Sequence, residues 1–372
     1  MTTAELPVIT VGGAAHERGL QYGRQAADRV QRTRSAYAEV YAHFATWQWD
    51  RVREEAQAFI DPIRAFHPDS LDEMAGIAEG AGLEFADVLA MNLRTEILFA
   101  AKVRTSGAEL PPMLECTSFA ARDSEGAQLI GQTWDWLTFS ADTVVLVEST
   151  PENGPAFMTV VEAGLLAKLG MNSAGLALAT NALVTAADTG RPGIPYHVML
   201  RALLDCRTPT EAATLLQSAH RSSSANYLFG TGEGLVVDAE TRPGNYADIS
   251  WGVPDDNGLL LHANHFTIAP AGTVHDVGAM LMADSLFRLQ RVRRLARESP
   301  QCGVEQWKTI LSDHAGSPAG ICCHPDPGTH SMDQWTTATG AIFEPADRRA
   351  HISVGNPCRG QWLTREYAQV WA

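Results

Sequence analysis

Apolar residues recur at helical spacing through the first third of the chain. A stripe that runs from Leu20 to Phe44 repeats with the period of an amphipathic helix. Farther on, Pro68-Asp69-Ser70 followed by Glu73 has the pattern of a capping box at the start of another helix. Residues 106–112 are polar and contain glycine and proline, which predicts an exposed loop. We therefore predict a helical N-terminal segment that ends in a loop.

From Cys116 onward the apolar period changes to two, which is typical of strands. Helices are expected again at 195–204 and 210–218, and a basic amphipathic helix is expected at 284–297. Strands grouped between helices predict an α+β fold in which helices cover two packed sheets, a four-layer αββα sandwich. The predicted strands cover residues 116–121, 128–136, 143–147, 157–161, 176–180, 227–229, 235–237, 259–262, 341–343 and 351–354.

Composition narrows the class of protein. A chain of 372 residues with 45% hydrophobic content can bury a large core in one domain or in two tightly joined ones. A net charge of −15 argues against nucleic acid and anionic membranes as partners. Neither a membrane-spanning stretch nor a signal peptide is expected. The six cysteines are therefore expected to be reduced thiols in a cytoplasmic protein.

Cys116 and Asp135 form the most informative pair of residues. A turn at 123–126 would join the strands that carry them and bring the thiol and the carboxylate together at one rim of a sheet. This arrangement suits an enzyme whose nucleophile is also its N-terminus. The free α-amine takes the thiol proton, and the carboxylate orients the amine. The alternative is that Cys116 is a small buried residue, and the spacing alone leaves both interpretations open.

Cys116-Thr117-Ser118, followed by Gly131-Gln132-Thr133-Trp134-Asp135-Trp136, resembles the start of the mature β-chain in the penicillin acyltransferase family. Its members are autoproteolytic N-terminal-nucleophile (Ntn) hydrolases, related at greater distance to choloylglycine hydrolases and penicillin V acylases. Three further segments are similar to the family's opening helix, central hairpin and His-x-Asn-His-Phe strand end: Gly12 to Gly23, Met171 to Leu176 and His262 to Phe266.

The resemblance implies the Ntn fold and self-cleavage between Glu115 and Cys116. The products would be a helical chain of residues 1–115 and a chain of residues 116–372 that stay together as a heterodimer. Glu115 departs from the family, whose type member has glycine before the cysteine. A carboxylate at this position would tend to raise the pKa of the thiol and alter the rate of cleavage.

Four further residues are candidates for the site. Asn264, at the end of an apolar strand, matches by resemblance a catalytic asparagine and could donate an N–H to an oxyanion; the alternative is a turn residue. Arg288 resembles a family arginine that would favour the thiolate, and Arg291 competes for this role. Asn181 and Asn226 could add oxyanion or substrate contacts or could bond only to the backbone.

A metal site is not expected. Cys322-Cys323-His324 with His330 offers ligand atoms, but adjacent cysteines lack the gap that lets both sulfurs reach one tetrahedral ion. The family resemblance places this segment in a buried strand. His262 and His265 flank Asn264 and could line a pocket or bind a metal, although a structural role is the commoner outcome for such histidines.

The leading hypothesis is an amidohydrolase or acyltransferase that acts on a linear amide of a small molecule. A thioester on Cys116 would pass the acyl group to water or to an amine, without a resident cofactor, although acyl-CoA could serve as acyl donor. One alternative is an amidase of the choloylglycine hydrolase or penicillin V acylase type. Another is a non-catalytic ligand-binding protein with the same fold.

Overall fold

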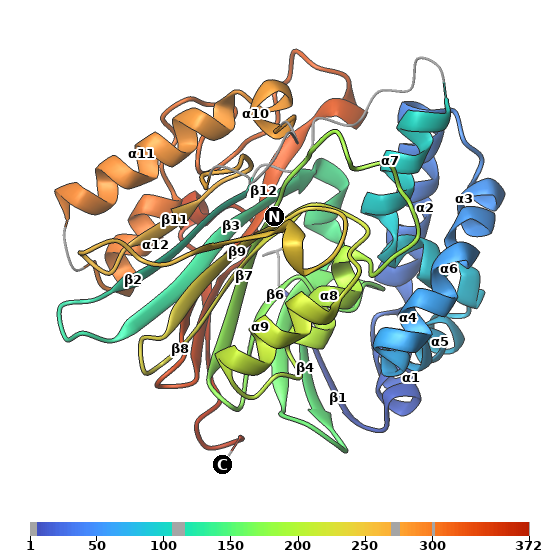
Figure 1. Ribbon diagram of the computed structural model, residues 1–372, viewed down its shortest axis with the longest axis horizontal. Coiled ribbons are helices and arrows are strands. Elements are labelled where there is room, and N and C mark those ends of the chain that lie inside the picture. The colour runs from blue at the N-terminus through green and yellow to red at the C-terminus, as the bar shows by residue number, and fades with distance from the viewer. Residues whose placement is uncertain (1–5, 106–115, 269–275, 300–301, 372) are drawn as a thin grey trace.

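The computed structural model describes residues 6–105, 116–268, 276–299 and 302–371. The helical period of the first third produces the helices that cover one side of the molecule (Figure 1). The long stripe is divided near Ala26 into two helices rather than one. The helices of this segment are α1 (Ala15–Gln25), α2 (Ala27–Ala45), α3 (Trp49–Ala56), α4 (Ile60–Phe66), α5 (Pro68–Ala81), α6 (Phe85–Asn92) and α7 (Arg94–Arg104).

Two of these helices, α1 and α5, approach each other closely because glycines face each other between them. A Cβ atom on Gly19 would lie 2.0 Å from the backbone oxygen of Glu73, and one on Gly76 would lie 2.1 Å from that of His16. Helix α5 confirms the predicted helix, but the predicted capping box is wrong. His67 is the N-cap residue, and Glu73 instead binds the buried guanidinium groups of Arg18 and Arg201.

The strands of the described residues form two sheets. The first has eight strands in the order β1-β4-β5-β6-β7-β8-β9-β10, antiparallel except for the parallel pair of β1 and β4. Its strands are β1 (Val8–Gly13), β4 (Val144–Pro151), β5 (Phe157–Glu162), β6 (Leu169–Asn172), β7 (Leu176–Ala182), β8 (Ala225–Thr231), β9 (Val236–Thr241) and β10 (Ile249–Gly252). Strand β1 was not predicted, since the resemblance gave Gly12 to Gly23 as a helix, and Gly12 and Gly13 instead end the strand.

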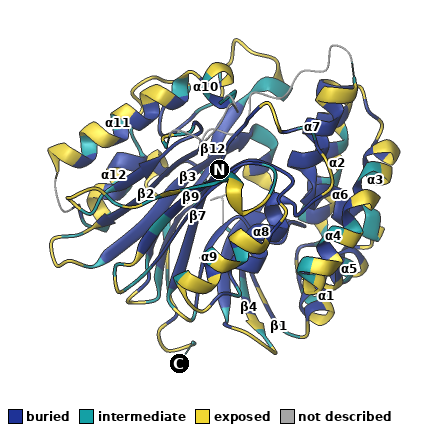
Figure 2. Cartoon of the chain, viewed as in Figure 1, coloured by how far each residue is buried: buried dark blue, intermediate teal, exposed yellow. Residues whose placement is uncertain are grey.

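The second sheet is antiparallel and has six strands in the order β11-β2-β3-β12-β13-β14. These are β11 (Leu260–His262), β2 (Cys116–Arg122), β3 (Gln128–Leu137), β12 (Trp335–Glu344), β13 (Arg349–Ser353) and β14 (Trp362–Glu366). Its strands β2 and β3 pack against β7 and β8 of the first sheet. Strand β3 is buried along its whole length, as expected of a strand covered on both faces (Figure 2).

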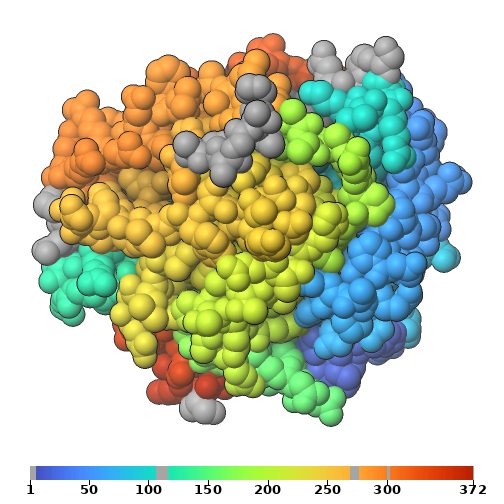
Figure 3. Space-filling model, in the orientation of Figure 1, coloured from blue at the N-terminus to red at the C-terminus, as the bar shows by residue number. Residues whose placement is uncertain are grey.

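Helices cover both outer faces of the sheet pair. Helix α1 contacts β1 and β4, and α8 (Tyr196–Leu203) and α9 (Pro209–Ser218) pack on the same side. The region of α8 and α9 adjoins the N-terminal helices on one face (Figure 3). On the opposite side, α11 (Asp284–Glu298) and α12 (Val304–Leu311) cover β2, β3, β11 and β12, and the short α10 (Gly278–Leu281) precedes them. The predicted αββα sandwich with an N-terminal helical segment is therefore confirmed.

The N-terminal segment is part of this fold, since β1 extends the first sheet and buried side chains of α2 belong to its core. Among the described helices, none combines the length and the apolar composition that a membrane crossing would require.

Candidate active site

Cys116 is the first residue of β2 and is fully buried between the two sheets. The predicted hairpin is confirmed, with a turn closed by the bond from the Asp123 nitrogen to the Ala127 oxygen. Cys116 pairs directly with Trp134, so Asp135 lies one position beyond it on the neighbouring strand. The backbone N–H of Asp135 interacts with the Cys116 thiol. The hairpin therefore brings the predicted nucleophile and carboxylate residue together.

The backbone of Cys116 is held on both sides by polar side chains. Its nitrogen donates to Asn264 Oδ1 at 2.6 Å. Its carbonyl oxygen accepts from Asn181 Nδ2 at 3.0 Å and from Arg288 Nη1 at 2.7 Å. All of these groups are buried, and Ser118 fixes the Asn181 amide by donating to its Oδ1 at 2.6 Å. Three candidate residues from the sequence thus contact the backbone of Cys116: Asn181, Asn264 and Arg288.

Arg288, and not Arg291, is the arginine that reaches this site. Its Nη2 donates to Asn264 Oδ1 at 3.0 Å, and its Nε donates to Asp284 one helical turn earlier at 2.9 Å. Arg291 points elsewhere and binds both carboxylate oxygens of Asp313 at 2.9 and 2.7 Å. Arg288 is almost completely buried, so its charge acts at short range on Cys116 and Asn264.

Strand β12, which pairs with β3 on the side opposite β2, holds the side chain of Asp135. The Thr337 hydroxyl of β12 donates to Asp135 Oδ1 at 2.5 Å. The register of β12 against β3 shifts between Thr337 and Thr339, which leaves Ala338 as an extra residue. Bulges of this kind often lie beside active sites, where they redirect a side chain.

The electrostatic environment of the thiol is mixed. Burial raises the pKa of Cys116 because a thiolate would lose its hydration. The positive charge of Lys168 is the largest influence that lowers this pKa; the carboxylate of Asp135 raises it, and Arg288 lowers it. The positive charges of Lys168 and Arg288 and the negative charge of Asp135 thus all act on the buried sulfur.

Lys168 is the site residue that the sequence reasoning missed. It is fully buried, and burial lowers its pKa to about 8. Its Nζ donates to Tyr196 Oη at 2.8 Å, and this phenol lies 2.8 Å from Thr180 Oγ1 in β7. A single lysine within Gly164-Leu165-Leu166-Ala167-Lys168-Leu169 was the available indication, because a buried charge in an apolar run needs a partner or a function.

Asn226 and the two histidines have no hydrogen bond to Cys116 among the described residues. Asn226 pairs with Asn181 across β7 and β8, and its amide nitrogen donates to the buried Asp238. His262 lies 2.9 Å from Glu240. His265 Nδ1 lies 2.7 Å from Ser285 Oγ, which accepts from the Asn264 nitrogen at 2.7 Å. His265 therefore supports the loop that carries Asn264.

Glu115 lies outside the described residues, so the structure describes only the Cys116 side of the predicted cleavage site. The segment with Cys322, Cys323 and His324 is an irregular loop, and the expectation of a buried strand there is wrong. Pro325 and Pro327 follow directly and lack the N–H groups that a strand ladder needs. His330 lies apart from this segment and stacks on His43 with ring centres 5.1 Å apart.

The chain is similar to an acyltransferase in sequence and, more weakly, to two hydrolytic enzymes in structure. It is 25% identical over 352 residues to the 40 kDa form of acyl-coenzyme A:6-aminopenicillanic-acid-acyltransferase from Emericella nidulans. The matched region covers 94% of this chain and 92% of that protein. A mutant of conjugated bile acid hydrolase from Clostridium perfringens has a TM-score of 0.46 at 11% identity, covering 69% of this chain and 93% of the other. Penicillin V acylase from Agrobacterium tumefaciens has a TM-score of 0.39 at 13% identity, covering 64% and 82%.

The model of one protein family, acyl-coenzyme A:6-aminopenicillanic acid acyl-transferase, matches residues 122–359. This range contains Asp135, Asn264 and Arg288, and Cys116 lies six positions before it. Most of the chain and three of the four predicted catalytic residues are thus covered, and the chain belongs to the acyl-coenzyme A:6-aminopenicillanic acid acyl-transferase family.

Proposed function

We propose that this protein cleaves itself before Cys116 and then cleaves or exchanges an amide-linked acyl group on a small molecule. The observation that carries the proposal is the contact between the Cys116 nitrogen and Asn264 Oδ1 at 2.6 Å. Cleavage would turn this nitrogen into an α-amine. Its hydrogen-bond acceptor is therefore in place, beside a buried thiol, in the full-length chain.

The first reaction is self-cleavage. The Cys116 sulfur attacks the carbonyl carbon of Glu115, the peptide bond to the Cys116 nitrogen breaks, and this nitrogen takes a proton as it leaves. Water then hydrolyses the thioester, which gives a carboxylate at Glu115 and restores the thiol. The products, residues 1–115 and 116–372, would stay together as a heterodimer, because the N-terminal helices and β1 are built into the core.

The second reaction uses the same sulfur on a small-molecule amide. The α-amine takes the thiol proton, and the thiolate attacks the substrate carbonyl carbon. The leaving amine receives the proton as the carbon–nitrogen bond breaks, and the acyl group stays on sulfur as a thioester. Water or a second amine then takes the acyl group. Acyl-CoA as donor would form the same thioester with loss of the CoA thiol.

The charges around the sulfur suit these steps. Arg288 and Lys168 would stabilise the thiolate and the oxyanion that follows it, because both cations act in a buried, poorly screened environment. Asp135 would attract the protonated α-amine and so orient it. The side-chain amides of Asn181 and Asn264 contact the Cys116 backbone and could donate an N–H to an oxyanion.

The amidase alternative, in which simple trimming exposes Cys116, is disfavoured by the N-terminal segment. A trimmed chain would lose β1 from the edge of the first sheet, together with the Tyr37 hydroxyl that bonds the buried Glu162 at 2.8 Å. The proposed reaction needs a reduced thiol at Cys116, and the cytoplasm, the expected location, keeps thiols reduced.

Mass spectrometry of the purified protein tests the proposal. Wild-type protein should give two chains, the larger beginning at Cys116, and Cys116→Ala should remain a single chain. The mature protein should then form an acyl adduct on Cys116 with one or more members of a panel of N-acyl amines. A wild-type chain that stays intact and forms no adduct would identify the protein as the non-catalytic alternative.

A further inference from the structure

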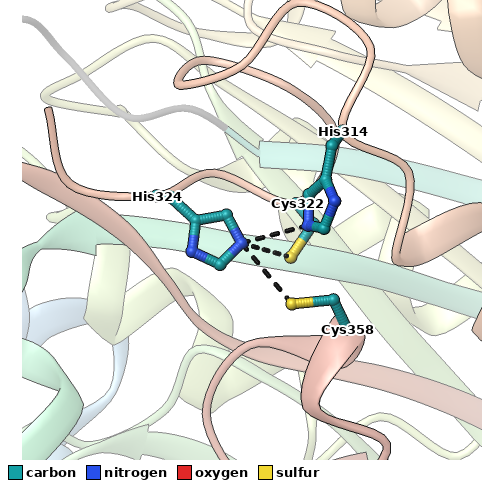
Figure 4. Close-up of side chains that lie close together, drawn as sticks. All are labelled: His314, Cys322, His324 and Cys358. Carbon is teal, nitrogen blue, oxygen red and sulfur yellow. Dashed lines mark hydrogen bonds between the residues drawn. The ribbon is translucent and has the colours of Figure 1, made fainter.

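The side chains of four potential metal ligands converge on one another (Figure 4). His314 follows α12, Cys322 and His324 lie in the loop after it, and Cys358 belongs to the short helix η5 (Pro357–Arg359) between β13 and β14. Their ligand atoms all lie within 4.8 Å of one another. His324 Nε2 lies 3.6 Å from Cys322 Sγ, 3.4 Å from Cys358 Sγ and 3.1 Å from His314 Nε2.

A single hydrogen bond at His324 Nε2 does not account for all of the contacts that this atom makes. A ring nitrogen of histidine has either one hydrogen to donate or one lone pair to accept with, so Nε2 of His324 can make one good hydrogen bond. Three polar atoms nevertheless converge on it at similar distances. Three contacts of 3.1, 3.4 and 3.6 Å to one ring nitrogen are what is expected when four ligands face a common centre.

The spacing is compatible with a tetrahedral zinc ion. Zinc bonds of about 2.3 Å to sulfur and about 2.0–2.1 Å to nitrogen, in tetrahedral geometry, place ligand atoms about 3.3–3.8 Å apart. The three distances from His324 lie within a few tenths of an ångström of this range. Two thiolates and two imidazoles form a complete ligand set of the structural type, with no position open for substrate.

The backbone holds the ligands in place without using their side chains. The Cys322 nitrogen donates to the Asp313 oxygen at 3.0 Å, and the His324 nitrogen donates to the Pro318 oxygen at 3.0 Å, which folds the loop back toward His314. Asn356 Nδ2 donates to the Cys323 oxygen at 2.9 Å, which ties the segment that carries Cys358 to the same loop. The four side chains therefore belong to a built site.

We propose that His314, Cys322, His324 and Cys358 bind one structural zinc ion. Both thiols lose their protons to solvent when zinc binds, and neither histidine carries a charge as a ligand. No metal was expected from the sequence because Cys322 and Cys323 are adjacent. The folded chain takes only Cys322 from that pair and takes its second sulfur from Cys358, a residue far along the sequence.

Hydrogen bonds connect the loop that contains Cys322, Cys323 and His324 to the active site. Cys323, between two of the ligands, donates its backbone N–H to Thr337 Oγ1 at 2.8 Å. The same hydroxyl donates to Asp135 Oδ1 at 2.5 Å. Zinc would therefore fix the loop that positions Thr337 against Asp135, and its role at Cys116 would be indirect.

The metal content of the full-length protein tests the site independently of any activity. Protein expressed with zinc in the medium should contain about one zinc ion per chain by elemental mass spectrometry. The double variant Cys322→Ser/Cys358→Ser should keep less than about a tenth of it. The matched control is Cys323→Ser, which changes the adjacent cysteine and should retain full zinc content.

A second measurement covers the case in which the double variant does not fold. Wild-type protein, reduced and stripped of metal, is titrated with Co²⁺, which absorbs visible light strongly when thiolates bind it in tetrahedral geometry. The expected result is a saturable absorption that Zn²⁺ abolishes by displacement. Wild-type protein without zinc and without the cobalt absorption, or equal zinc in wild-type and a folded double variant, would overturn the site.

Discussion

Asn264 Oδ1 accepts a hydrogen bond from the backbone nitrogen of Cys116 across 148 positions of sequence. The same oxygen accepts from Arg288, and the amide nitrogen of Asn264 donates to the Ala182 oxygen at 3.1 Å. The sequence suggested that Asn264 donates to an oxyanion. In the full-length chain its oxygen holds the nitrogen that self-cleavage would release, so acceptor and donor roles need to be separated by experiment.

Two substitutions at Asn264 separate them. Asn264→Ala removes both functions and should lower kcat by about 10²–10³. Asn264→Asp keeps an oxygen beside the Cys116 nitrogen but removes the N–H donor. If holding the nitrogen is the main role, the aspartate variant should self-cleave about tenfold faster than the alanine variant, because a hydrogen bond is kept. Equal impairment of the two variants would favour the oxyanion role.

Arg288→Ala should raise the pKa of the Cys116 thiol, because the thiolate loses a nearby cation. The pH profile of Cys116 alkylation by iodoacetamide, followed by mass spectrometry of the peptide that contains it, should move to higher pH. Arg291→Ala is the control, since this arginine binds Asp313 and lies outside the site. If Arg291→Ala shifted the profile and Arg288→Ala did not, the assignment of the two arginines would be reversed.

Asp135→Asn should shift the same profile in the opposite direction. The carboxylate raises the pKa of the thiol, so its neutral isostere should move alkylation to lower pH. Self-cleavage and turnover should nevertheless fall, because the amide lacks the charge that attracts the protonated α-amine. A more acidic thiol combined with lower activity would be the specific sign of this role. Asp135→Asn protein with normal self-cleavage would exclude it.

Local patterns explain which parts of this molecule could be predicted from sequence. Turn residues at 123–126 between two apolar runs determine the β2–β3 hairpin, and the apolar stripe of α11 marks that helix within a residue or two of its observed ends. Strand β10 is half exposed and short, and no alternation marks it. Long buried strands lack the alternation as well, because both of their faces are covered.

The parts of the site that were missed depend on contacts between distant segments. Lys168 directly precedes β6 of the first sheet and acts on Cys116 of the second sheet only because the two sheets pack against each other. Cys358 meets Cys322 only when η5 packs beside the loop after α12. Neither relationship has a fixed spacing in sequence. Asp135, Asn264 and Arg288 could be predicted because they lie in segments that resemble family motifs. Lys168 lies in no such motif.

Lys168→Met should move the alkylation profile of Cys116 to higher pH, because the positive charge of Lys168 is the largest influence that lowers the pKa of this thiol. Methionine has similar length and suits a fully buried position, so the fold should be retained. The matched control is Lys102→Met, which changes an exposed lysine of α7 and should leave the profile unchanged.

The shape of the wild-type profile gives a second check on Lys168. Its pKa is lowered to about 8, so the lysine is charged below this pH and increasingly neutral above it. Its electrostatic stabilisation of the thiolate should therefore decrease as the pH rises through 8. The wild-type thiol should then titrate over a wider pH range than a single isolated group does. Lys168→Met should titrate at higher pH and over a narrower pH range than the wild type. If both proteins titrated with the same midpoint and the same width, Lys168 would be a structural partner of Tyr196 and would have no role at the sulfur.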